Sequence, residues 1–275
     1  MRRGRVAQLG ERLVRNEEAE GSNPFSSTNY LTTHQQYTGA HLRSIETPTA
    51  DPAFLYQDIL VAIAPERRIN NGEPSLHAIC LAALKVTEGE TVVHVGAGVG
   101  YYTANPEKLA GKSGSVLAYE IEQDLAHRAA ANLSAWKNVS VIHGSGSQET
   151  LPQCDAIYVN AGASHPLEVW LDALRPNGRL LFPLTPKEGA GGTPALGGML
   201  LVTRVGEAGY SARFVCRAAF ISCIGARDEA AAVKLSEAFA RDGLHNVRSL
   251  WRGTTPDATC WCSGEGWWLS SSENR

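Results

Sequence analysis

The sequence has no long apolar segment, no paired cysteine motif and little net charge, and each absence excludes a class of protein. No run in its 275 residues approaches the roughly 18–20 apolar residues of a membrane-spanning helix. No apolar stretch follows Arg2, Arg3 and Arg5 to make a signal peptide, so we expect a cytoplasmic protein. A formal net charge of −3 argues against a surface that neutralises many nucleic-acid phosphates.

The cysteines give no sign of a metal centre. There are six of them, and no C-x-x-C pair of the kind that builds zinc sites. Cys260 and Cys262, the closest pair, would share one face of a strand-like run, and we interpret them as packing residues. With 43% hydrophobic and 19% charged residues, the composition is that of a folded globular protein. We predict reduced thiols and no metal site.

The beginning of the chain is polar and has no sustained apolar period. We expect residues 1–45 to be a disordered tail outside the core. Its opening, RGRVAQLGERLVRNEEAEGSNPFSST, resembles the product of a start codon placed too early, inside a neighbouring transfer-RNA gene. Part of the tail is therefore a candidate mis-called start. The alternative is a short basic arm that uses Arg12 and Arg15.

Helical and strand-like patterns follow. DPAFLYQDILVAIA and EPSLHAICLAAL both have helical spacing, which predicts an N-terminal helical segment over residues 46–84 that contributes to a cofactor site. Residues 85–225 alternate strands and helices, as in a Rossmann-like α/β fold with a doubly wound, mainly parallel sheet and an antiparallel edge hairpin. Residues 226–275 predict a small C-terminal α+β extension. Its tryptophans should form a satellite layer, and these are Trp251, Trp261, Trp267 and Trp268.

A glycine loop is the sharpest local signal. VGAGVG, residues 95–100, lies where a buried strand turns toward a helix, and glycine there allows positive φ and close approach of a ligand. A dinucleotide-binding loop, G-x-G-x-x-G, would need glycine at the position of Tyr101, so the spacing favours S-adenosylmethionine over NAD. Glu120, at the end of the next strand, could accept hydrogen bonds from the ribose of either cofactor. In the expected helix, Pro106 should cause a kink or a restart.

Together these segments resemble the protein-L-isoaspartate O-methyltransferase family of class I methyltransferases, over roughly residues 54–222. The resemblance rests on NNGEPSLHA, VVHVGAGVGYYTA, AYEIE, YVNAGASHP and LRPNGRLLFPL. It implies S-adenosyl-L-methionine as cofactor and O-methyl transfer to a carboxylate, with a protein or peptide as the candidate acceptor.

The resemblance also implies which residues surround the cofactor. The glycines would lie under its methionine part, an acidic residue and its neighbour would hold the ribose and adenine, and a Gly-Ser-Gly segment would edge the adenine. To these we add Asn160, at a later strand end, which could bind ligand or hold the turn. The complete set is Asn71, His77, Gly96, Gly98, Gly100, Glu120, Ile121, Ser145, Gly146 and Asn160.

Two positions depart from the family pattern. The family has Ile-Ser-Ala-Pro-His before the glycine loop, and its serine, thought to assist the transfer, aligns with Gly72. The family's Gly-Asp-Gly reads Gly144-Ser145-Gly146 here, which replaces an acidic contact to the adenine amine by a hydroxyl. These departures leave the acceptor open and predict weaker cofactor binding.

The catalytic residues stay open as well. A carboxylate acceptor is already ionised near neutral pH and needs no base, whereas a hydroxyl or amine would use His77 or His165. Asn71, Ser75 and His165 are the catalytic candidates, and two of them also have a structural explanation: Ser75 begins a helix and His165 precedes Pro166. One alternative function is a non-catalytic S-adenosylmethionine-binding regulator or partner subunit. A further one is an NAD-dependent oxidoreductase.

Overall fold

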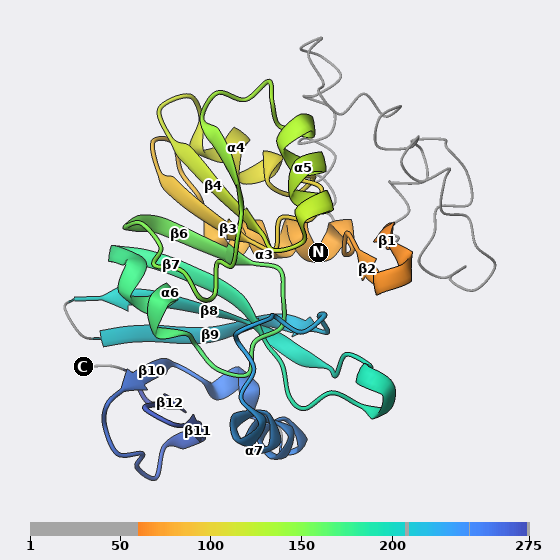
Figure 1. Cartoon of the computed structure of the whole chain (residues 1–275). Coiled ribbons are helices and arrows are strands. Elements are labelled where there is room, and N and C mark those ends of the chain that lie inside the picture. Colours follow the sequence, from red (N-terminus) through yellow and green to blue (C-terminus); the bar gives the residue numbers. More distant parts are fainter. Residues whose placement is uncertain (1–59, 207–208, 242, 274–275) are drawn as a thin grey trace, which may run out of the picture.

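Most of the strands join one mixed sheet. The computed structural model describes residues 60–206, 209–241 and 243–273, and within these ranges ten strands are ordered β11-β12-β10-β9-β8-β7-β6-β3-β4-β5 (Figure 1). The half from β5 to β7 is parallel and the half from β8 to β11 is antiparallel. The predicted Rossmann-like α/β architecture is confirmed.

The parallel half determines where a ligand can bind. Its strands are β3 (Thr91–Val95), β4 (Ser115–Glu120), β5 (Val139–His143), β6 (Cys154–Val159) and β7 (Leu174–Leu184). The chain runs outward from β3 through β4 to β5, and then returns to place β6 on the other side of β3. The strand order therefore reverses between β3 and β6, and open α/β sheets bind their ligands at the carboxyl ends of such strands.

Helices cover both faces of this sheet. One face carries α3 (Pro74–Leu84) and α4 (Ala104–Ala110), with α5 (Gln123–Asn132) beside α4, and the other carries α6 (Glu168–Ala173) and α7 (Glu229–Ala240). Side chains alternate along each strand accordingly. In β3, Val92 packs with the α3 cluster and Val93 packs with the α6 cluster.

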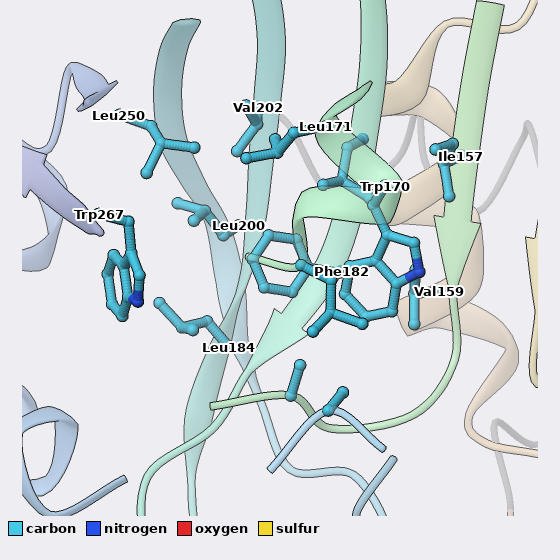
Figure 2. Close-up of a cluster of buried hydrophobic side chains, with 14 of the residues drawn as sticks. Ile157, Val159, Trp170, Leu171, Phe182, Leu184, Leu200, Val202, Leu250 and Trp267 are labelled. Carbon is cyan, nitrogen blue, oxygen red and sulfur yellow. The ribbon is translucent and has the colours of Figure 1, made fainter. Parts of the chain in front are cut away.

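The α6 side holds Trp170, the largest fully buried side chain of the described residues. Figure 2 shows Trp170 next to Phe182 in a cluster that reaches Trp267. The ring centroids of Trp170 and Phe182 are 5.6 Å apart, and both side chains are fully buried. The indole Nε1–H of Trp170 donates to the backbone oxygen of Gly146 at 2.7 Å, which ties this core to the loop after β5. A buried indole N–H needs such a partner.

The antiparallel half contains the predicted hairpin and three further strands. β8 (Gly197–Val205) and β9 (Gly209–Ala218) pair as expected, and β10 (Ser249–Arg252), β12 (Trp267–Ser270) and β11 (Cys260–Gly264) continue the same sheet. The expectation of a tryptophan satellite layer was wrong. Trp261 and Trp267 pack with the main core, whereas Trp251 and Trp268 stack on each other with centroids 5.6 Å apart.

The segment before α3 differs from the helix predicted there. Residues 51–59 lie outside the described residues, as does the whole predicted tail with its candidate start site. The end of the run forms β1 (Ala62–Ala64), which pairs through the turn η2 (Pro65–Arg67) with β2 (Ile69–Asn70). Residues 60–64 are therefore not helical, because Pro65 interrupts the apolar run and the backbone finds its partners across the β1–β2 pair.

The helix after the glycine loop begins late. It starts at Ala104, which places Pro106 in the first turn, where a backbone N–H has no partner within the helix. The kink or restart predicted at this proline is therefore not observed, and no interior hydrogen bond is lost. Two 3-10 turns complete the described elements, η3 (Ala190–Gly192) and η4 (Leu244–Asn246).

Candidate functional site

A cavity of about 600 Å³ opens at the carboxyl ends of β3, β4 and β6. Its walls come from the loop before α3, the glycine loop, the ends of β4 and β6, the loop after β5 and the segment after β9. Most of the predicted cofactor residues line it, namely Asn71, His77, Gly96, Gly98, Glu120, Ile121, Ser145, Gly146 and Asn160.

Three predicted residues lie elsewhere. Gly100 is buried under α5, where a Cβ would come 2.8 Å from Leu133 Cδ1. Ser75 is not part of the cavity wall. His165 lines a second cavity of about 370 Å³ with Asp228 and Arg252, and there its Nδ1 is 3.2 Å from Ser164 Oγ. Burial lowers the pKa of His165.

Glu120 places a buried carboxylate beside the glycine loop. It is 6% exposed, its Oε2 accepts the backbone N–H of Gly98 at 2.6 Å, and its Oε1 accepts the N–H of Glu122 at 3.0 Å. Burial raises the pKa of Glu120. Since a carboxylate has about four acceptor positions, each oxygen keeps one for a ligand. Two adjacent hydroxyls, as on a ribose, match this arrangement.

β1 packs against the glycine loop. Gly98 has φ +58°, and a Cβ on it would lie 3.0 Å from Ile63 Cδ1. The turn η2 is fixed at the same place, because Arg67 pairs with Glu122 and, at 2.6 Å, with Asp124. The β1–β2 segment thus forms a wall of the cavity beside Glu122.

A chain of hydroxyls borders the loop after β5. Ser147 Oγ donates to the backbone oxygen of Ile224 at 2.6 Å, and Ser145 Oγ lies 2.9 Å from Ser147 Oγ. Because Ser147 has already used its single proton, Ser145 must be the donor between the two hydroxyls. Ser145 Oγ can still accept a hydrogen bond. An adenine amine is a donor and would therefore match it.

An imidazole fills the space beside Gly72. His77 is 2% exposed, its ring stacks on Tyr102 with centroids 3.5 Å apart, and its Nδ1 is 2.7 Å from the hydroxyl of Tyr158. Burial lowers the pKa of His77 to about 3, so the ring is neutral near pH 7. A Cβ on Gly72 would lie 2.4 Å from His77 Nε2, and Gly72 has φ +76°. No hydroxyl stands at the position of the family serine.

A second buried histidine supports Asn160. His94 is fully buried, its Nδ1 is 2.8 Å from Thr103 Oγ1 and its Nε2 is 2.7 Å from Asn160 Nδ2. Burial lowers the pKa of His94 to about 3. The sequence analysis singled out Asn160 but neither His94 nor Thr103. The signal was a histidine inside the apolar strand run VVHVG, two residues before the first glycine of the loop.

The described residues give no metal site. No group of three or more His, Cys, Asp or Glu side chains within the described ranges could hold a metal ion. The six cysteines are free thiols. Among the helices of the same ranges, none has the length and apolar character needed to cross a membrane.

Comparison with known proteins identifies the family. The family model described as Protein-L-isoaspartate(D-aspartate) O-methyltransferase (PCMT) matches residues 43–191, more than half of the chain. The chain belongs to this family. S-adenosylmethionine is the cofactor of the PCMT family. The matched region ends before β8, so the antiparallel half of the sheet lies beyond it.

Individual PCMT relatives agree with this assignment. Protein-L-isoaspartate O-methyltransferase 2 of Archaeoglobus fulgidus is 39% identical over 115 residues, which are 40% of this chain and 52% of the relative. The chain thus spans about half the length of that relative. The Methanocella arvoryzae protein-L-isoaspartate O-methyltransferase is 34% identical over 170 residues, covering 56% of this chain and 89% of the relative.

A solved structure shares the fold. It is that of a beta-aspartate methyltransferase (PCMT) from Plasmodium falciparum in complex with S-adenosyl-L-homocysteine. It superimposes with a TM-score of 0.54 at 21% identity and covers 80% of this chain and 98% of that chain. At this level of identity the similarity supports the fold alone.

Proposed function

We propose that the protein is an S-adenosylmethionine-dependent O-methyltransferase whose acceptor is a carboxylate on a protein or peptide. The observation that carries this proposal is the buried carboxylate of Glu120, which lies beside the glycine loop of a family member and keeps acceptor positions open toward a cavity of about 600 Å³. A cavity of this size is ordinary for a cofactor site.

The wall of the cavity fits the three parts of the cofactor. Glu120 would accept from the two ribose hydroxyls, and Ser145 Oγ would accept from the adenine amine. Ile121, whose side chain is 38% exposed, offers an apolar surface beside the base. Gly96 and Gly98, both with positive φ, leave room for the methionine part along the backbone. When bound, the cofactor supplies a methyl group activated on a sulfonium.

For the transfer itself, this chain has to position the acceptor and exclude water. Leu196, Phe220 and Ile221 line the cavity with apolar side chains, and Arg217 lines it as well. The Arg217 guanidinium lies over the Phe239 ring and donates to the backbone oxygen of Leu196 at 3.2 Å, and from this position it would attract a carboxylate near Leu196. A carboxylate is ionised near neutral pH, so no general base is needed. Of the three weak catalytic candidates, Asn71 lines the cavity, and we propose it for contact with the acceptor.

The experiment is a calorimetric titration with S-adenosyl-L-homocysteine, followed by radiolabelled methyl transfer to an isoaspartyl peptide. The matching aspartyl peptide is the control, and NADH should not bind. Binding with transfer to the isoaspartyl peptide alone is the expected result. Absence of S-adenosyl-L-homocysteine binding would overturn the proposal.

A second candidate is a non-catalytic binder of the same cofactor, acting as a regulator or partner subunit. Gly72 favours it, because the hydroxyl of the family pattern is missing and His77 fills the adjacent space. Tight binding of S-adenosyl-L-homocysteine without transfer to any peptide or protein carboxylate would select this candidate over the enzyme.

A further inference from the structure

A buried relay of three side chains ends at the cavity with an unsatisfied acceptor. Thr103 and His94 are fully buried, and His94 connects Thr103 Oγ1 at 2.8 Å to Asn160 Nδ2 at 2.7 Å. Within the described ranges, Asn160 Oδ1 is buried and has no hydrogen-bond partner. A buried oxygen without a partner is costly, which indicates that a ligand group satisfies it.

The orientation of the Asn160 amide, with Nδ2 toward His94 Nε2, determines where the proton of the His94 ring lies. His94 is neutral near pH 7 because burial lowers its pKa to about 3, so its ring has one N–H and one lone pair. An amide nitrogen can only donate, so the lone pair must be on Nε2, and the N–H on Nδ1 donates to Thr103. With the NH₂ of Asn160 toward His94, as in the structure, Oδ1 is left for a donor.

Asn160 lies beside the glycine loop, where the methionine part of the cofactor is expected. Its backbone N–H donates to Val95 O at 2.8 Å, directly before the glycine loop. A Cβ on Gly96 would lie 3.5 Å from the backbone of Asn160 and 3.7 Å from its Cβ, so the two residues are in close contact. The methionine part of the cofactor would pass this point, and its ammonium is the group that only donates.

We infer that Asn160 Oδ1, oriented by Thr103 and His94, binds the ammonium group of the cofactor's methionine part. This inference rests on the proposed function, since it assumes that S-adenosylmethionine occupies the cavity. Asn160 is the binding residue, and His94 and Thr103 are positioning residues.

Three ligands and two substitutions test it by calorimetry. S-adenosyl-L-homocysteine carries both ammonium and carboxylate, S-adenosyl-3-thiopropylamine carries only the ammonium, and 5′-methylthioadenosine carries neither. Asn160→Leu should weaken the first two ligands by a similar factor, roughly 10- to 100-fold for a charged hydrogen bond, and leave the third unchanged. Asn160→Asp keeps an acceptor and should retain both amine ligands.

The positioning role needs its own variant. His94→Phe keeps an aromatic ring next to Tyr158, whose ring centroid is 5.4 Å away, and deletes both nitrogens. It should lower the affinity ratio of S-adenosyl-3-thiopropylamine to 5′-methylthioadenosine, whereas a purely structural role would weaken both ligands equally.

The outcomes separate this inference from the proposed function. If wild-type protein binds none of the three ligands, the proposed function fails. If it binds them and Asn160→Leu weakens S-adenosyl-L-homocysteine but not the thiopropylamine, the amide binds the carboxylate and the inference is overturned. Equal weakening of all three ligands, or of none, overturns it as well.

Discussion

The imidazole of His77 occupies the space that a side chain on Gly72 would need, since a Cβ there would lie 2.4 Å from Nε2. The ring cannot move aside easily, because it stacks on Tyr102 and is hydrogen-bonded to Tyr158. A side chain at position 72 and the imidazole of His77 therefore compete for the same space. A serine at position 72 would have to displace the imidazole.

Gly72→Ser should destabilise the protein by about 2–4 kcal/mol, from overpacking against His77 and from positive φ in a residue with a Cβ. Urea unfolding measures the change. Gly89→Ser is the matched control, because Gly89 has φ +88° but a Cβ there would meet nothing closer than Ser113 Oγ at 3.8 Å. The part of the stability loss that comes from overlap with the imidazole should disappear in the double variant Gly72→Ser/His77→Ala. Equal losses of stability in Gly72→Ser and Gly89→Ser would contradict a steric conflict with His77.

Acidification should unfold the protein partly through His77 and His94. Burial lowers both pKa values from 6.5 to about 3, so unfolding takes up protons as the pH falls below 6.5. The stability is fully present above pH 6.5 and is lost toward pH 3, by up to about 1.4 kcal/mol per pH unit for each histidine. Urea unfolding at pH 7.5 and 5.5 measures this loss. In His94→Phe the free energy of unfolding should change less between the two pH values. An unchanged pH dependence would show that His94 does not have a lowered pKa in the folded protein.

Glu120→Gln should weaken S-adenosyl-L-homocysteine binding roughly 10-fold or more, because one oxygen becomes a donor that cannot accept from a ribose hydroxyl or a backbone N–H. Calorimetric titration measures the effect. Glu122→Gln removes a carboxylate that lines the same cavity but is paired with Arg67. If both variants bind equally well, Glu120 does not contact the cofactor.

Arg179→Met should lower stability by about 2–4 kcal/mol without changing cofactor affinity. The guanidinium, 16% exposed, pairs with Glu90 at 2.8 Å and donates to the backbone oxygens of Leu84 and Lys85 at the end of α3. Arg175→Met is the control, because that side chain is 43% exposed and pairs with Asp155. Thermal unfolding should separate the two variants, and similar melting temperatures would show that the buried pair contributes little.

The parallel half of the sheet could be predicted because its strands and helices leave local patterns in the sequence. Buried strands alternate with helices, and the glycine loop marks the turn after β3. Residues 60–64 were assigned wrongly because LVAIA is too short for its periodicity to distinguish strand from helix. The role of His94 could not be predicted, since its partners Thr103 and Asn160 are 9 and 66 residues away and meet only in the folded state.

The continuation of the sheet by β10, β12 and β11 covers part of the edge of the β8–β9 hairpin. β10 pairs with β9 at Ser249–Ser211 and Leu250–Tyr210, so it covers the beginning of the long hairpin strand. A chain ending after α7 would expose unpaired N–H and C=O groups along β9, a template on which another chain can add a strand. The outermost strand, β11, has an irregular register between Cys260 and Cys262, and such bulges discourage edge-to-edge pairing. The C-terminal strands thus cover the beginning of β9 and make the irregular strand β11 the edge of the sheet.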